Sequence, residues 1–192
     1  MKNGRIRAAV TQALLRSFVS AASEEELAQL TAAMGGAEVL EDIRGATAFA
    51  WTEVSQHMRL AQTVAAAFGS VRTVACWRGA LGDTAQRAIL RTFVGMAATL
   101  FGSSPHALAS QADRLYRHLT EDLGELTGVR ESDHRHRIEL RGFPAHVWPL
   151  TVHLGGLQGG LEAMLDVCEA HGGVTVDRVD PVGEADLTIW WR

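Results

Sequence analysis

The fold is decided by the segment ELTGVRESDHRHRIELRG, residues 125–142, where the hydrophobic period changes from helical to extended. In its second half, residues 134–141, apolar Ile138 and Leu140 alternate with arginine and glutamate. An alternation of period two is typical of a strand that buries one face. We therefore predict a β-hairpin whose first strand is 125–131 and whose second strand is 134–141.

On the C-terminal side of this hairpin, the pattern returns once to a helix and then to strands. A helical period runs from about residue 149 to 170, and Gly172-Gly173 ends it. Two further alternating segments follow, at 174–179 and 185–191. The order is therefore β-β-α-β-β, which predicts a four-stranded antiparallel sheet covered on one face by helix.

On the N-terminal side, the hydrophobic residues recur at helical spacing. Ser23 and Glu26 form a capping-box pattern that opens one of these helices. The predicted helices cover residues 5–21, 24–34, 38–46, 52–68, 71–82, 84–100 and 105–123. The predicted fold class is α+β, an N-terminal helical bundle followed by β-β-α-β-β with a four-stranded antiparallel sheet.

Composition excludes several classes of protein. The 192 residues carry 18 Lys+Arg against 22 Asp+Glu, a net charge of −4, and 47% are hydrophobic. Such a chain can bury a core, and it lacks the positive field that nucleic-acid binding requires. Two cysteines, Cys76 and Cys168, favour reduced thiols. Without a signal peptide or a long apolar run, we expect a cytoplasmic protein with no membrane insertion.

Three segments carry a resemblance to known domains: the hairpin at 124–142, the helix LGGLQGGLEAML at 154–165, and a last strand ending LTIWW at 187–191. Together they resemble an uncharacterised paralogous domain family common in myxobacteria. They also resemble the wider ligand-binding fold of NO signalling and Golgi transport, which includes heme-NO-binding domains, vinyl-reductase domains and subunits of the TRAPP complex. The resemblance covers residues 51–192.

No linker is visible in the sequence, so we expect a single domain, 1–192, with a helical extension at 1–47 and a ligand-binding-fold core at 48–192. The resemblance implies the fold and a tendency to hold a small apolar ligand. The Tyr-x-Ser-x-Arg motif of heme-NO-binding domains is absent, and Tyr116 is the only tyrosine. We therefore expect no cofactor, with heme as the alternative.

Four glycines make the C-terminal helix unusual. Gly155 and Gly159 are four residues apart, as are Gly156 and Gly160, so each pair leaves a flat strip on one helix face. Four interior glycines cost about 3–4 kcal/mol relative to alanine. Close packing of the helix on the sheet would offset that cost, and so would a ligand pocket with these glycines as one wall.

The eight histidines raise the question of a metal or heme. His134 and His136 are two apart on one strand face, where both imidazoles can point at one ion, and His146 and His153 are seven apart. Without a metal-binding motif around them, scattered histidines are the simpler interpretation, and we expect no metal site. Candidate heme ligands are His57, His106 and His118.

Two surface features indicate a partner. Arg135, Arg137 and Arg141 share the outer face of the second strand, where they would bind an anion or an acidic partner, or pair with neighbouring glutamates. Trp190 and Trp191 must point to opposite faces of the last strand, so one of them lies on the outer face. An outer tryptophan favours an interface with a protein partner or a homodimer, unless the N-terminal helix covers it.

No catalytic motif is present, so the chain is not assigned an enzymatic activity. The leading hypothesis is a non-catalytic cytoplasmic sensor or adaptor. Its pocket lies between the helices of residues 84–123 and the glycine helix, with His136, Trp148 and His153 in its lining, and binding of a small hydrophobic ligand regulates a protein–protein interaction. The alternatives are a structural dimerisation module with a filled core and a heme- or metal-binding protein.

Overall fold

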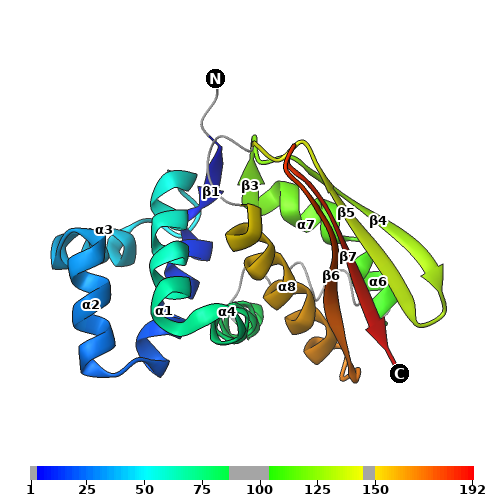
Figure 1. The fold of residues 1–192 in the computed structure, drawn as a ribbon, viewed down its shortest axis with the longest axis horizontal. Coiled ribbons are helices and arrows are strands. Elements are labelled where there is room, and N and C mark those ends of the chain that lie inside the picture. Colours follow the sequence, from blue (N-terminus) through cyan, green and yellow to red (C-terminus); the bar gives the residue numbers. More distant parts are fainter. Residues whose placement is uncertain (1–3, 87–103, 145–149) are drawn as a thin grey trace.

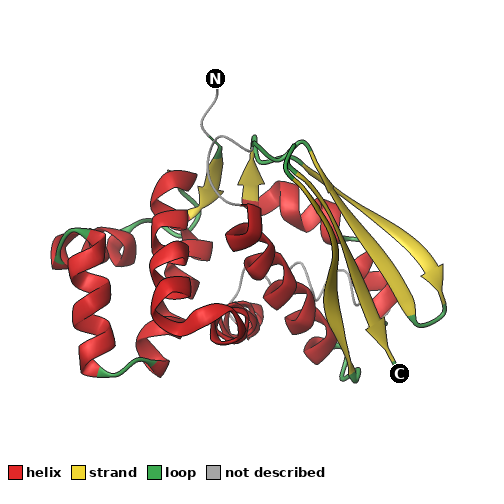
Figure 2. Cartoon of the chain, in the orientation of Figure 1, coloured by secondary structure: helices red, strands yellow, loops and turns green. Residues whose placement is uncertain are grey.

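The computed structural model describes residues 4–86, 104–144 and 150–192. Helices make up one half of the molecule and a four-stranded sheet the other, and α8 (Leu150–Val167) lies between them (Figure 1). The predicted α+β class, with helices first and an antiparallel sheet at the C-terminal end, is confirmed (Figure 2). No helix in these three ranges is long and apolar enough to cross a membrane.

The N-terminal half is a bundle of helices. Its members are α1 (Ala8–Ala21), α2 (Glu24–Met34), α3 (Ala37–Gly45) and α4 (Val54–Gln86). The predicted capping box at α2 is present, because Ser23 Oγ accepts from the Glu26 backbone and the Glu26 carboxylate accepts from the Ser23 backbone. Gly35, at φ 93°, ends α2 in the left-handed conformation that glycine adopts without strain.

Helix α4 contains a break where the sequence predicts an end. Gly69 has φ 74° and ψ 171°, so two helices follow each other across a kink, in agreement with the predicted division into 52–68 and 71–82. The second of them brings Trp77 and Arg78 against α8. Most of the helix predicted at 84–100 falls on residues after Gln86, which lie outside the described part of the chain.

A small sheet was not predicted. Its central strand β1 (Arg5–Arg7) pairs antiparallel with β2 (Trp51–Glu53) and with β3 (Thr120–Glu121). Residues 5–7, predicted as the first turn of a helix, are therefore extended. The helix predicted over 105–123 is wrong in detail, since α6 (Pro105–Ala109) and α7 (Ala112–Leu119) stand in its place and β3 follows. Strands of two or three residues carry no readable alternation, and their partners are remote in sequence.

The larger sheet has the predicted strands. They are β4 (Glu125–Ser132), β5 (Arg135–Arg141), β6 (Gly172–Asp180) and β7 (Glu184–Trp191), in the order β4-β5-β7-β6 with antiparallel neighbours throughout. Both outer strands contain an extra residue that interrupts the register, Glu131 in β4 and Asp177 in β6.

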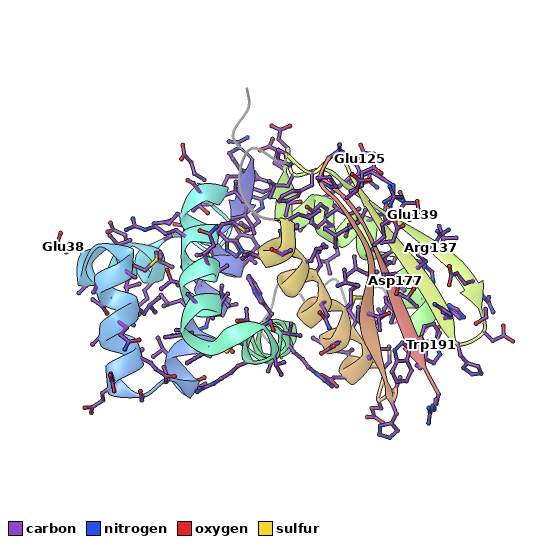
Figure 3. All side chains as sticks on the ribbon, viewed as in Figure 1. Glu38, Glu125, Arg137, Glu139, Asp177 and Trp191 are labelled. Carbon is purple, nitrogen blue, oxygen red and sulfur yellow. The ribbon has the colours of Figure 1, made fainter. Side chains whose placement is uncertain are left out.

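The two faces of the sheet differ as predicted. Ile138, Leu140 and Leu187 are fully buried beneath α6, α7 and α8. On the outer face, Arg137 pairs with Glu139 at 3.1 Å; Figure 3 labels both on β5. Neighbouring arginines and carboxylates continue this ladder, so the predicted cationic stripe is balanced by acidic side chains.

The last two tryptophans lie on opposite faces of β7. Trp191 is buried on the inner face, whereas 39% of the surface of Trp190 is exposed. The described residues of the core form two hydrophobic clusters. One joins the sheet to α7 and α8, and the other joins α1, α2, α3 and α4. Val10 and Val152 pack against both clusters, so the region around them is the seam between the two halves.

Candidate ligand-binding site

A cavity of about 80 Å³ lies at this seam. Its wall comes from β1, α1, α4, α7, β3 and α8, so residues far apart in the sequence line it. The apolar lining includes Ile6, Val10, Met58, Val152 and Leu157. The polar side chains of the lining are His57, Trp77, Tyr116, Thr120 and His153.

His57 on α4 is a buried imidazole, 3% exposed. Its Nδ1 lies 2.9 Å from Oγ1 of Thr11 on α1, a hydrogen bond that ties the two helices together. Burial, aided by the nearby His153, lowers the pKa of His57 to about 3. The ring is therefore neutral at pH 7.

His153 on α8 and Tyr116 on α7 form a second buried pair. The Tyr116 hydroxyl donates to the Leu123 carbonyl at 2.7 Å and lies 3.0 Å from His153 Nε2. Because a hydroxyl has one proton, the imidazole must be the donor in the second bond, which assigns the Nε2–H tautomer to His153. Burial lowers the pKa of His153 to about 4 and raises the pKa of Tyr116, so both groups are neutral.

Trp77 brings the largest side chain to the cavity. Its ring is 4% exposed and lies 5.2 Å from the His57 ring, centroid to centroid. The indole N–H has no hydrogen-bond partner among the residues that the structure describes. Thr120 Oγ1 donates to the Tyr116 carbonyl at 2.8 Å. Each of the other polar side chains named in the lining therefore has a hydrogen-bond partner within the protein.

The four glycines of α8 do not share one role. A Cβ on Gly159 would lie 2.5 Å from Trp77 Cβ and 2.7 Å from the Val74 carbonyl oxygen, so Gly159 lets the backbones of α8 and α4 touch. Gly156 lines the cavity beside the Trp77 ring. Gly155 faces open space, and Gly160 is half-buried. The close packing is thus against a helix, where the sequence led us to expect the sheet.

Gly155 opens onto a second, larger hollow, a groove of about 450 Å³ between α4, α8 and β6. Val74, Val176 and Val179 contribute apolar walls, and the Gln158 amide, which donates to the Val174 carbonyl at 3.1 Å, fixes α8 to β6. Val152 lines both the groove and the buried cavity. Val152 is therefore the residue that the two hollows share.

His136 lies elsewhere. It is buried on the inner face of β5, where its Nδ1 is 3.5 Å from Nδ1 of His106 on α6, and the His106 ring meets Trp191 edge-on at 4.6 Å. Burial, with a contribution from His106, lowers the pKa of His136. Of the residues predicted to line the pocket, the structure brings Gly156 and His153 to the cavity and places His136 outside it. Trp148 lies outside the described residues.

Sequence reasoning did not assign Trp77, Tyr116 and Thr120 to a site. The signal was present in part, since His57, Tyr116 and His153 are polar residues on apolar helix faces. No group of three or more His, Cys, Asp or Glu residues in the described ranges could hold a metal ion. Of the four histidines considered for a metal site, His146 falls outside those ranges.

Heme, the alternative ligand that the sequence resemblance left open, needs a large pocket and a free axial ligand. Pockets for drug-sized ligands span roughly 300–1,000 Å³, and a heme exceeds most such ligands, whereas the cavity has about 80 Å³. Tyr116 is a protonated phenol that donates a hydrogen bond to the Leu123 carbonyl, and Nε2 of His153 is hydrogen-bonded to Tyr116. These two atoms are therefore engaged within the protein rather than free to ligate iron. As the described residues stand, the cavity does not fit a heme.

The sequence matches no family model and no curated protein sequence. Solved structures are similar over almost the whole chain. An H-NOX protein from S. oneidensis in the Fe(II) ligation state has a TM-score of 0.68 at 13% identity, covering 97% of this chain and 96% of that chain. Fe(II) unliganded H-NOX protein from K. algicida has 0.64 at 14%, covering 97% of each.

An oxygen complex of an H-NOX domain related to soluble guanylate cyclases has a TM-score of 0.58 at 12% identity, covering 97% of this chain and 95% of that chain. The predicted resemblance to the heme-NO-binding fold is confirmed, whereas the resemblance to the myxobacterial, vinyl-reductase and TRAPP families stays a prediction. At such low identities the likeness establishes the architecture alone, and the chain has the H-NOX fold.

Proposed function

We propose that the chain is a non-catalytic sensor domain that holds a small hydrophobic ligand in the 80 Å³ cavity and regulates a protein–protein interaction by its occupancy. The observation that carries this proposal is the cavity itself, which is bordered by six elements and lined largely by apolar side chains. The proposal treats residues 1–192 as one domain. Similarity to the oxygen complex of an H-NOX domain supports a small molecule as the ligand.

Occupancy has a short route to the surface. Val152 lines the cavity on one side and the groove on the other, and the groove is bounded by α4, α8 and β6. A ligand that contacts Val152 and Trp77 favours one packing of α8 on α4, and it shifts the population by its difference in affinity for the two packings. Because the groove is bounded by α4 and α8, its shape changes when the packing of these two helices changes.

The heme alternative leads to a direct prediction. Protein expressed with a heme precursor, or titrated with hemin, is expected to show no stoichiometric Soret band from heme in this cavity, because the cavity as described is too small and its tyrosine and histidine are engaged. An absorbance scan checks this, with a globin as positive control. A one-to-one Soret band that is lost in His57→Leu or His153→Leu would overturn the heme-free assignment.

Xenon tests the cavity without knowledge of the natural ligand. Under xenon pressure, methyl resonances of Ile6, Met58 and Val152 are expected to shift and saturate, because a preformed apolar cavity takes up such a probe. Methyl-detected NMR measures the shifts. In Ile6→Phe the added ring fills the cavity, so the remaining methyl groups are expected to respond at least tenfold more weakly.

The competing hypothesis, a dimerisation module with a filled core, predicts no saturable xenon response and a dimer. Native mass spectrometry, compared with the denatured mass, reports both the oligomeric state and a retained ligand. The exposed Trp190 on the outer sheet face supports that hypothesis. A dimer that Trp190→Ser dissociates, together with a cavity that ignores xenon, would replace the sensor proposal.

A further inference from the structure

One polar side chain of the described cavity lining has incomplete hydrogen bonding. Trp77 Nε1 is buried and has no partner in the described part of the chain, whereas His57, Tyr116, Thr120 and His153 all have partners within the protein. The indole nitrogen only donates hydrogen bonds. The missing partner must therefore be an acceptor.

An unbonded buried donor is costly. Leaving such a group unsatisfied costs about 1–3 kcal/mol, and most buried polar groups in proteins have a partner, so the exceptions point to a water, an ion or a ligand. Trp77 lines a cavity, so the partner can come from the occupant of that cavity. An acceptor atom on that occupant removes the cost.

Charge and size restrict the occupant further. Among the described residues, the lining contains no Asp, Glu, Lys or Arg, and both of its imidazoles are neutral at pH 7. An ion would lie there without a counter-charge, which makes an ionic ligand unfavourable. The volume of about 80 Å³ is far below the roughly 300–1,000 Å³ of pockets for drug-sized ligands, so the occupant is a small molecule.

We infer that the cavity takes a small neutral molecule with a single carbonyl- or ether-type oxygen, which accepts a hydrogen bond from Trp77 Nε1 while its alkyl groups contact Ile6, Met58 and Val152. This inference rests on the proposed function and names the chemical class of its ligand. It makes Trp77 the specificity-determining residue of the site.

Acetone and isobutene test this class. They have the same shape and four non-hydrogen atoms, but only acetone has an acceptor. Affinities of both are measured by NMR titration for the full chain and for Trp77→Phe, which keeps an aromatic ring and removes the N–H. The ratio of acetone to isobutene affinity is expected to fall about tenfold in Trp77→Phe, the equivalent of about 1.4 kcal/mol. Trp190→Phe, on the outer face, is the matched control and should leave the ratio unchanged.

The outcomes separate the inference from the function on which it rests. If neither molecule binds in the cavity, the proposed function itself fails. If both bind and the ratio is the same in Trp77→Phe, ligand binding stands and the acceptor class is overturned. If Trp77→Phe does not fold, the wild-type spectrum decides. The assigned Trp77 indole proton should then move downfield with acetone and not with isobutene, and equal shifts would overturn the inference.

Discussion

Lowering the pH from 7 to 5 is expected to reduce the free energy of unfolding by about 4 kcal/mol, about 2 kcal/mol for each of His57 and His153. Both imidazoles are buried and neutral in the folded protein, with pKa values of about 3 and about 4. In the unfolded chain the same groups take up protons near pH 6.5, so acid favours unfolding.

The sign follows from which state binds more protons. Between pH 6.5 and 4 the unfolded chain is protonated at both positions and the folded protein is not, so stability rises with pH across this window. His136, whose pKa is also lowered, acts in the same direction. Urea denaturation at a series of pH values measures the effect.

Variants identify the source of this pH dependence. His153→Gln retains a donor for Tyr116 but does not titrate, so it should remove about half of the loss between pH 7 and 5. His171→Gln, at an exposed position, controls for the substitution itself. A stability that is flat from pH 7 to 5 in the wild-type protein would show that these imidazoles are solvated rather than buried.

Gly159→Ala is expected to destabilise the protein by about 2 kcal/mol or more, although alanine favours helix over glycine by about 1 kcal/mol. The new Cβ would meet the backbone of α4, 2.7 Å from the Val74 carbonyl oxygen and 2.8 Å from the Arg78 nitrogen. Backbone atoms cannot rotate away, so α8 would have to move. That movement would strain the ion pair in which Arg78 Nε lies 2.6 Å from Asp166 Oδ2.

Gly155→Ala is the matched control, one helical turn earlier on the same helix. Its Cβ would meet nothing within 4 Å, so we expect a gain of about 0.5–1 kcal/mol from helix propensity alone. Denaturation midpoints at a constant denaturant slope compare the two variants. Equal stabilities for Gly155→Ala and Gly159→Ala would mean that α8 and α4 are not in backbone contact.

The larger sheet and its helix were predictable because their signals are local. The alternation at 134–141 and 185–191 indicates strands with one buried face, and the glycine pairs indicate a helix that packs closely against a neighbour. The small sheet was not predictable, since β1 pairs Ile6 with Thr52 and Thr120, and nothing in a three-residue strand identifies such distant partners.

The candidate site was predictable only in part. His153 and Gly156 stood out because they interrupt or open an apolar helix face. Trp77 did not, because a tryptophan on a helix is usually part of the core, and only the three-dimensional packing shows that its N–H lacks a partner. The cavity is lined by residues on both sides of the kink at Gly69, His57 before it and Trp77 after it. The sequence indicates that a helix ends near Gly69, but it does not give the direction in which the next helix runs.

The extra residues in β4 and β6 have a consequence for how copies of the chain meet. Each places an acidic residue, Glu131 or Asp177, at an interruption of an edge strand, and Asp177 also accepts from the hydroxyls of Thr175 and Thr188. Bulged, charged edges resist the addition of a foreign strand and so guard against aggregation and amyloid growth. Pairing of two copies of the chain through the edge strands β4 or β6 is therefore disfavoured, so a second copy would contact the outer face of the sheet rather than its edges.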